Sequence, residues 1–214
     1  MKSKFLLLFL VCATIQAFGQ RKFSAALEIS AGISESTQPG FSFIPHKGVQ
    51  FGRNAFLKGG YNLTDKLDFT LGVGYMNINA VEYVFFASTD VDFTQTQISH
   101  RYLVIPAGFK YHFGSFYLNP EIGIAISQRH FINQTSFFIE NHTSQTSGFG
   151  GASSDFGFNK ITLPLILNLG TEFDVKPVKI LFGIKAYYSL DKMSEILTFS
   201  RHYYGVGVMT GVKF

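Results

Sequence analysis

The chain of 214 residues contains a single cysteine, Cys12, which lies in an apolar run near the N-terminus. The sequence that follows this run has no cysteine, so it can form no disulfide bond and carry out no thiol chemistry. It also has no apolar stretch of about 20 residues, which is the length that a membrane-spanning helix needs. Lysine and arginine nowhere form a run, and this excludes a basic tract that would bind nucleic acid.

The N-terminus has the pattern of a secretory signal peptide. Lys2 and Lys4 precede the apolar run Phe5–Ala13, and Ala17 and Gly19 provide small residues before Gln20. Such a pattern predicts cleavage after Gly19, and the apolar run is too short to span a membrane. We therefore expect residues 1–19 to be removed and residues 20–214 to form the mature domain. Loss of the two lysines leaves 16 basic and 14 acidic residues, so the formal charge falls from +4 to +2.

The C-terminal stretch from His202 to Phe214 alternates with a period of two. Apolar or interfacial residues occupy one set of positions, and glycine, methionine, tyrosine and lysine occupy the other. A period of two places these sets on opposite faces of one β-strand. A strand with one greasy face that ends on an aromatic residue is typical of bacterial outer-membrane barrels, in which lipid covers the outside and the interior is polar.

The same alternation occurs seven more times. In residues 67–79, for example, Leu67, Phe69 and Leu71 alternate with Asp68 and Thr70. The other six stretches are 23–33, 49–63, 97–113, 116–132, 158–173 and 178–188; in 49–63, Arg53 falls on the lipid-facing set. Eight strands predict an all-β fold, an eight-stranded antiparallel transmembrane β-barrel. Ten strands are the alternative if a long connection contains a hairpin.

The connections alternate in length. Those at 64–66, 114–115 and 174–177 are short, and those at 34–48, 80–96, 133–157 and 189–201 are long and polar. Short turns face the periplasm in outer-membrane barrels, so both termini are expected there. Aromatic residues on the lipid-facing set would form a girdle at this end: Phe23, Tyr61, Phe69, Phe113, Phe116, Phe173 and Phe214. A soluble lipocalin-like barrel, the alternative, would place its apolar face inward and would need no such girdle.

Charged residues occupy the inward set. They are Glu28, Lys58, Asp68, Lys110, Glu121, Arg129, Glu172, Lys179, Lys185 and Lys213, together with Asn119 and Asn168. An eight-stranded barrel is just wide enough for side chains to fill it, and buried charges need partners. We therefore expect a polar network that plugs the interior. The alternative is a gated path for ions or small solutes along the basic side chains.

No residues form a recognisable catalytic or metal-binding motif. Ser99 and His100 are adjacent in the sequence. A nucleophilic serine needs an imidazole that a third residue holds in orientation, and no residue at a diagnostic spacing could play this part. His130 and His202 fall on the lipid-facing set. His142 with Glu140 or Asp155 would offer metal ligands only on a loop of unfixed geometry. The sequence predicts no enzyme, no cofactor and no metal site.

Two tracts, Tyr102–Phe113 (YLVIPAGFKYHF) and Ile161–Phe173 (ITLPLILNLGTEF), each place a proline within an alternating strand. Together with the signal and the terminal Lys213-Phe214, they resemble the PorT-like outer-membrane β-barrel proteins of the Bacteroidetes. The resemblance covers the mature chain and implies a fold similar to small OmpA- and OmpX-like barrels. It also implies an accessory role in a secretion or gliding apparatus, and it carries no catalytic residues.

These observations favour a non-catalytic protein of the bacterial outer membrane, surrounded by lipid and monomeric as a barrel. Its outer loops or rim, above all residues 133–157, would bind another envelope protein of a transport or secretion assembly, with no nucleic acid as partner. A narrow, porin-like channel for ions or small solutes is the second hypothesis. A barrel enzyme that modifies lipids is the third.

Overall fold

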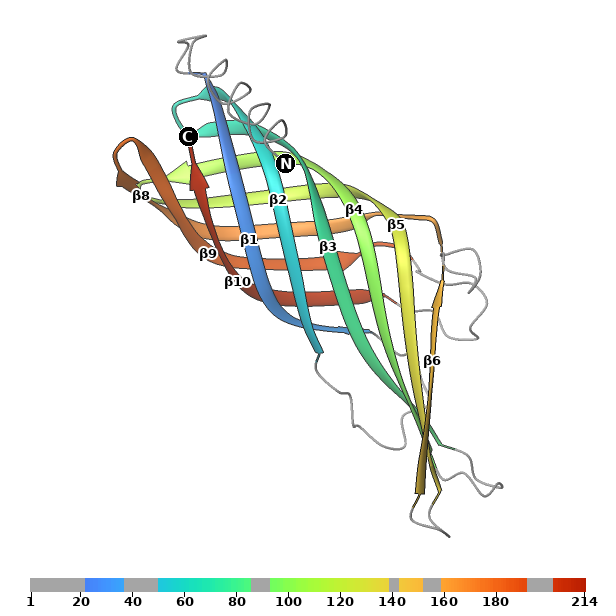
Figure 1. Cartoon of the computed structure of the whole chain (residues 1–214). Helices are drawn as coiled ribbons and strands as arrows, with labels where there is room; N and C mark the ends of the chain where they lie inside the picture. Colours follow the sequence, from blue (N-terminus) through green and yellow to red (C-terminus); the bar gives the residue numbers. More distant parts are fainter. Residues whose placement is uncertain (1–21, 37–49, 86–92, 139–142, 152–158, 192–201) are drawn as a thin grey trace, which may run out of the picture.

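The computed structural model describes residues 22–36, 50–85, 93–138, 143–151, 159–191 and 202–214 (Figure 1). The regular elements in these ranges are all β-strands. They are β1 (Phe23–Ser36), β2 (Gln50–Thr64), β3 (Leu67–Phe85), β4 (Phe93–Phe113), β5 (Phe116–Phe138), β6 (Thr143–Gly151), β7 (Ile161–Thr162), β8 (Pro164–Val175), β9 (Val178–Ser189) and β10 (Tyr203–Lys213). Among the same residues, no helix is long and apolar enough to cross a membrane.

The strands close into an antiparallel ring. The order runs β4-β3-β2-β1-β10-β9-β8-β5, and β4 pairs with β5 to complete the circle. The short β7 pairs with β5 and continues the path of β8, so the ring in the described part of the chain has eight strands. The first and last strands meet, with Leu27 opposite Val212 and Ile33 opposite Val206. The predicted eight-stranded antiparallel barrel is therefore confirmed.

Pro164 explains the interruption between β7 and β8. Proline has no amide hydrogen to donate to the ladder, so pairing with β5 is interrupted between Thr162 and Leu165. On β4 the other proline of the sequence motif, Pro106, pairs with Gly123 of β5. A Cβ atom on Gly123 would lie 3.1 Å from the ring of Pro164. The two proline tracts thus pack against the same glycine on the inner wall of the barrel.

Strands β3, β4, β5 and β6 extend well beyond the ring at the long-loop end (Figure 1). Pairing continues as far as Phe85 with Phe93, Phe93 with Phe137, and Phe138 with Thr143. Much of residues 80–96 and 133–157, which the sequence suggested were loops, is therefore strand. The hairpin on which the ten-strand alternative depended does exist, as β5 and β6, but it does not widen the ring, because β6 pairs only with β5 among the described residues. We call β6 and the ends of β3, β4 and β5 that lie beyond the ring the extension.

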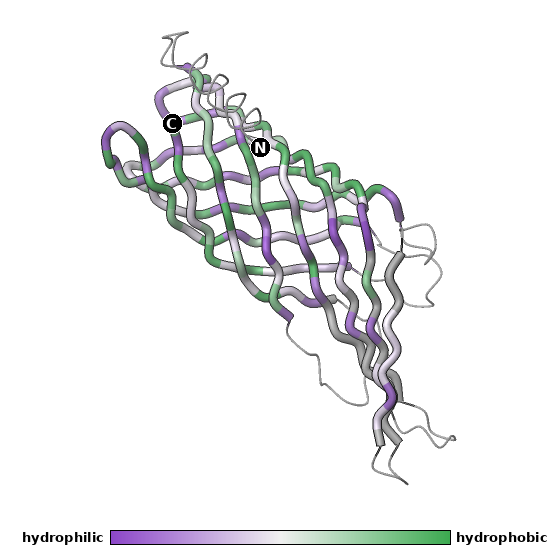
Figure 2. The backbone as a smooth tube through the Cα atoms, in the orientation of Figure 1, coloured by the Kyte–Doolittle hydropathy of each residue, from purple (hydrophilic) through white to green (hydrophobic). Residues whose placement is uncertain are grey.

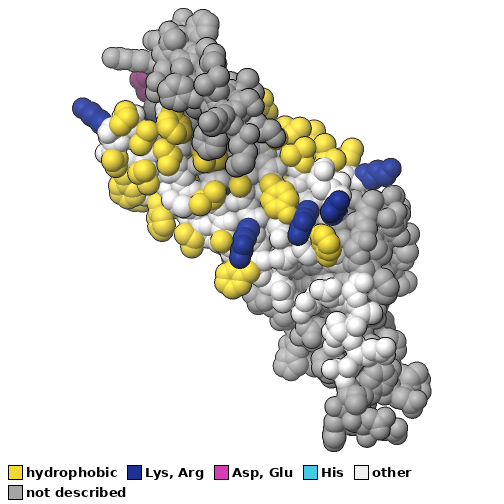
Figure 3. Space-filling view, in the orientation of Figure 1, with side chains coloured by type: hydrophobic (Ala, Val, Ile, Leu, Met, Phe, Trp, Pro, Cys, Tyr) yellow, Lys and Arg dark blue, Asp and Glu magenta, His cyan; other side chains and the backbone are white. Residues whose placement is uncertain are grey.

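The two faces of the ring differ in polarity, as the colour alternation along the strands in Figure 2 shows. The apolar set of each strand lies on the outside, where Ile29, Leu167 and Ile184 are each about half exposed. Six of the seven predicted aromatics at the short-turn end are also exposed; the seventh, Tyr61, is half-buried, and its ring lies 5.0 Å from that of Phe23. Figure 3 shows apolar side chains spread over the visible face of the barrel outside the extension. A soluble lipocalin-like barrel, with its apolar side chains inside, does not have this arrangement.

Candidate functional site

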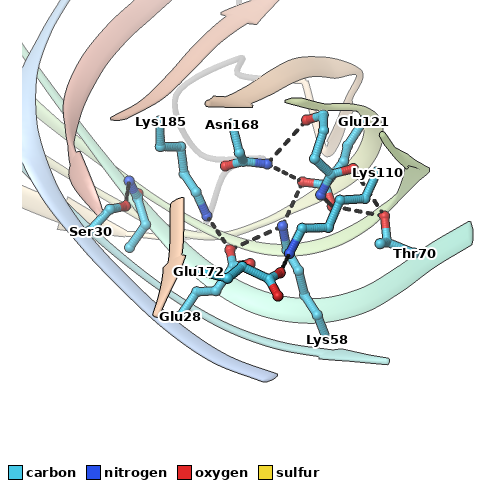
Figure 4. Close-up of polar contacts among 11 residues, drawn as sticks. Glu28, Ser30, Lys58, Thr70, Lys110, Glu121, Asn168, Glu172 and Lys185 are labelled. Carbon is cyan, nitrogen blue, oxygen red and sulfur yellow. Dashed lines mark hydrogen bonds and ion pairs between the residues drawn. The ribbon is translucent and has the colours of Figure 1, made fainter. Parts of the chain in front are cut away.

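The centre of the lumen holds four charged side chains from four strands (Figure 4). Lys58 Nζ of β2 lies 2.7 Å from Glu121 Oε2 of β5 and 3.0 Å from Glu28 Oε2 of β1. Lys185 Nζ of β9 donates to Glu28 Oε2 at 3.1 Å. All four side chains are almost completely buried, so the two carboxylates and two ammonium groups compensate one another across the barrel.

Neutral side chains complete the hydrogen bonds of this cluster. Asn168 Nδ2 donates to Glu121 Oε2 at 2.8 Å, and Asn119 Nδ2 donates to Glu121 Oε1 at 3.1 Å. The hydroxyl of Thr70 donates to Glu121 Oε1 at 3.3 Å. Glu121 therefore has four donors in all, as a buried carboxylate needs. We call this set the central network: Glu28, Lys58, Thr70, Asn119, Glu121, Asn168 and Lys185.

A second set lies at the short-turn end of the lumen. Lys110 pairs with Glu172, and His112 Nε2 lies 2.8 Å from Asp68 Oδ2. Lys213 Nζ lies between these two acids, 3.6 Å from Glu172 Oε1 and 3.7 Å from Asp68 Oδ2. Three strands distant in sequence, β3, β8 and β10, thus meet at the mouth through one lysine.

Two residues of the predicted interior set lie elsewhere. The side chain of Lys179 is nearly half exposed at the rim, 3.3 Å from Asp174 and 3.8 Å from Glu172. Arg129 is exposed on the outer face, so its inward assignment was wrong. The cause is a β-bulge: Tyr102 pairs with Ser127 and Arg101 with Arg129, which leaves Gln128 as an extra residue. A single extra residue reverses the facing of all residues beyond it.

The long-loop half of the lumen is filled by apolar and aromatic side chains, which the sequence reading missed. This plug consists of Phe56, Met76, Ile78, Tyr102, Val104, Ala125, Ile166, Tyr187 and Tyr203. His100 is completely buried beside it, and its Nε2 lies 2.9 Å from the Tyr203 hydroxyl. The sequence contained a signal for the plug, because apolar and aromatic residues replace polar ones in the inward set toward the long-loop end of the strands. The plug and the central network meet where Lys185 Nζ lies 4.0 Å from the centre of the Phe56 ring.

The free space near these groups is small. A cavity beside Lys185 and Tyr187 has a volume of about 10 Å³, and one beside Lys58 and Lys110 about 20 Å³. Spaces of this size hold single water molecules. In the part of the chain that the structure describes, no group of three His, Cys, Asp or Glu residues is placed to bind a metal ion. His142, Glu140 and Asp155 lie outside the described residues.

The neighbouring Ser99 and His100 point away from each other. Ser99 Oγ donates to Asn77 Oδ1 at 3.1 Å on the outer side of β4, whereas His100 bonds to Tyr203 inside. Adjacent residues of a strand face opposite sides of the sheet, so the serine and imidazole cannot form the hydrogen-bonded pair of a hydrolase. His202 lies at the rim, where its Nδ1 bonds to the Ser189 carbonyl oxygen at 2.9 Å and its ring stacks on Tyr188.

A closed antiparallel ring with an apolar outer surface and paired charges inside is the architecture of a small transmembrane β-barrel of the outer-membrane type. No protein family and no curated protein matches the chain.

Solved structures that resemble the fold include Ail, the attachment invasion locus protein of Yersinia pestis (15% identity, TM-score 0.44, 90% of this chain and 99% of that one). Neisserial surface protein A (13%, 0.36, 90% and 96%) and the outer membrane protease OmpT of Escherichia coli (8%, 0.43, 90% and 93%) are further examples. Sequence identities this low carry no information on function.

Proposed function

We propose that this chain is a non-catalytic protein of the bacterial outer membrane that binds another envelope macromolecule as an accessory part of a transport or secretion assembly. The observation that carries the proposal is the contrast between a filled lumen and a large structured extension. The expected signal at residues 1–19, outside the described residues, would deliver the chain to this membrane. Membership of the PorT-like proteins is part of the same proposal.

The filled lumen favours binding over conduction. The plug and the central network lie one above the other across the ring, so a permeating ion would have to displace either packed aromatic rings or paired charges. Removing one partner from a buried ion pair costs about 3–5 kcal/mol. A channel would instead need a continuous wet path, and the cavities beside the network are of single-water size.

The extension offers surfaces that suit a macromolecular partner. The ladder between β3 and β2 ends at Asn77, and Asn79 N donates to the Ser34 hydroxyl, so the unpaired edge of β3 lies beyond Asn79; the far edge of β6 has no partner among the described residues. Unpaired edges present backbone N–H and C=O groups to which an added strand can bind. Residues 144–148 of β6 are all exposed and carry polar, uncharged side chains or none. The extension lies beyond the ring, so it is not needed to form the part of the barrel that lipid surrounds.

The test is an affinity purification from outer membranes in mild detergent, comparing the intact chain with a variant that lacks the tip of the β5–β6 hairpin. Asn133 pairs with Gly148, so residues 134–147 can be replaced by the two-residue turn Asn-Gly without disturbing the strands below. We expect a stoichiometric partner to co-purify with the intact chain. Its recovery should fall at least about tenfold with the truncated variant, a loss of roughly 1.4 kcal/mol or more of binding free energy.

The matched control carries the same turn at the opposite end of the barrel. Gly114-Ser115 joins Phe113 and Phe116, which are paired, so Asn-Gly fits there as well. This control should retain the partner. Failure of any partner to co-purify with the intact chain, or equal recovery with the truncated variant, would contradict the proposal.

A further inference from the structure

Three arginines form a lateral row on the outer face where the ring meets the extension. Arg53 of β2 pairs with Asn77 of β3, Asn77 pairs with Arg101 of β4, and Arg101 pairs with Arg129 of β5. Neighbouring strands lie about 4.8 Å apart, so the row spans roughly 14 Å from β2 to β5. Lys160 lies near the β5 end of this row, since its carbonyl oxygen accepts a hydrogen bond from Ser127 N at 2.9 Å, and its side chain is exposed. We call Arg53, Arg101, Arg129 and Lys160 the basic row.

The charges of the basic row have no acidic partner within the described part of the chain, where no ion pair joins any of the four residues to an acid. Arg101 and Arg129 occupy directly opposite positions on adjacent strands, where like charges are destabilising. Two guanidinium groups held opposite each other repel, and an anion from outside the chain that binds both of them would remove this repulsion.

The surroundings of the row indicate what kind of anion fits. One step toward the short turns the outer face carries Tyr75, Leu103 and Ile161, all exposed to the degree typical of the lipid-facing surface. The Arg101 guanidinium lies 4.6 Å from the centre of the Phe131 ring. Figure 3 shows Lys and Arg side chains gathered across this face where the apolar surface ends. A ligand here must offer negative groups beside long apolar chains.

We infer that the basic row binds the phosphate groups of an anionic glycolipid in the leaflet at the long-loop end, with its acyl chains against the apolar surface below. Guanidinium groups bind phosphate through two parallel hydrogen bonds, which makes arginine better suited than lysine for this role. A row of about 14 Å is long enough for a headgroup that carries two phosphates. The inference rests on the proposed function for the identity of this leaflet.

The basic residues at the short-turn end of the barrel are arranged differently from the three arginines. Lys22, Lys66 and Lys176 are exposed at or beside the short turns and do not face one another across paired strands. They can lie freely in water and need no ligand. These three lysines provide a matched control, because their removal changes the net charge by the same amount as removal of the three arginines.

The test measures binding of bis-phosphorylated lipid A to the full mature chain in neutral detergent micelles. We expect saturable binding that Arg129→Gln weakens about tenfold, the effect of one lost charge-assisted contact. The triple variant Arg53→Gln, Arg101→Gln, Arg129→Gln should weaken it further, and Lys22→Gln, Lys66→Gln, Lys176→Gln should leave it within about twofold. Heat-modifiable migration on gels shows that each variant is folded. Should the triple variant not fold, Arg129→Gln alone decides, because this side chain is exposed.

Two further probes separate the sources of the anion. Dephosphorylated lipid should bind at least about tenfold more weakly than the phosphorylated form, and millimolar inorganic phosphate should not displace the lipid. Equal binding of the dephosphorylated lipid, displacement by free phosphate, or an equal loss in the lysine variant would each overturn the inference. Because this experiment needs no partner protein, a failed affinity purification would overturn the proposed function and leave the lipid site intact.

Discussion

At the scale of single residues, the period of two was sufficient to place most inward charges. Glu28, Lys58, Glu121 and Lys185 are buried inside because lipid outside allows charge on one face only. Their pairing could not be read from the sequence, since β2 and β5 meet across the lumen and no rule of spacing relates Lys58 to Glu121. Arg129 was assigned to the wrong face because of the β-bulge at Gln128. The alternation of polar and apolar residues does not reveal such a bulge before the point where the two faces exchange.

Lys58 is the residue whose loss should be felt most, because it is shared by Glu28 and Glu121. The substitution Lys58→Met removes the cation and leaves two buried carboxylates with one ammonium group. We expect the free energy of unfolding to fall by about 3–5 kcal/mol. Urea unfolding in micelles, followed by tyrosine fluorescence, measures it, since the chain has 10 tyrosines and no tryptophan.

The matched control for this substitution is Lys66→Met at an exposed turn, which should change the unfolding free energy by no more than about 0.5 kcal/mol. Equal midpoints for the two variants would show that the central network does not stabilise the barrel.

At the scale of elements, the number, order and antiparallel pairing of the barrel strands were predictable, and their outer ends were not. Alternation of polarity requires lipid on one side and a lumen on the other. Beyond the ring, β3 to β6 have neither, so residues such as Thr135 and Thr146, whose hydroxyls lie 3.2 Å apart, show no apolar set. Strand and polar loop are then alike in composition, and the β5–β6 hairpin stayed one of two alternatives.

Closure of the ring depends on a close approach between β1 and β10. Gly32 pairs with Gly207, and a Cβ atom on Gly207 would lie 2.4 Å from the Ala31 carbonyl oxygen and 2.8 Å from Gly32 Cα. These are backbone atoms and cannot move independently, so Gly207→Val should destabilise the barrel by at least about 1–3 kcal/mol. The fraction of heat-modifiable, folded protein after refolding measures the effect.

The control for Gly207 is Gly59→Val on the outer face. The nearest atom to a Cβ there is the Leu71 carbonyl oxygen at 3.8 Å, an ordinary contact. This variant should refold as well as the wild type. If Gly207→Val refolds equally well, the ring is not closed as described between β1 and β10.

At the scale of the whole molecule, three zones follow one another along the barrel: charged pairs at the mouth and centre, an apolar plug, and the extension. The sequence predicted that the interior is filled, and it missed that the filling changes from charged to aromatic along the axis. Orientation in the membrane stays a prediction from loop length. The short turns at Asp65-Lys66 and Gly114-Ser115 place that end in the periplasm, and the extension then faces outward.

The orientation can be tested with single cysteines, since Cys12 is the only native one and can be replaced by serine. A membrane-impermeant maleimide applied to intact cells should label Thr146→Cys in β6 and leave Asp65→Cys unlabelled until the outer membrane is opened. Both positions are exposed in the structure, so reactivity reports location alone. Labelling of Asp65→Cys in intact cells would place the short turns outside and reverse the orientation.

We propose that the lumen is sealed and that the protein acts through its outer surfaces, and conductance of the purified chain in planar bilayers is the sharpest check of both. We expect no steady conductance for the wild type or for the folded variants Lys110→Glu and Lys185→Glu, because the plug of aromatic side chains stays in place in all three. A steady conductance whose ion selectivity reverses with either substitution would instead identify the chain as a channel.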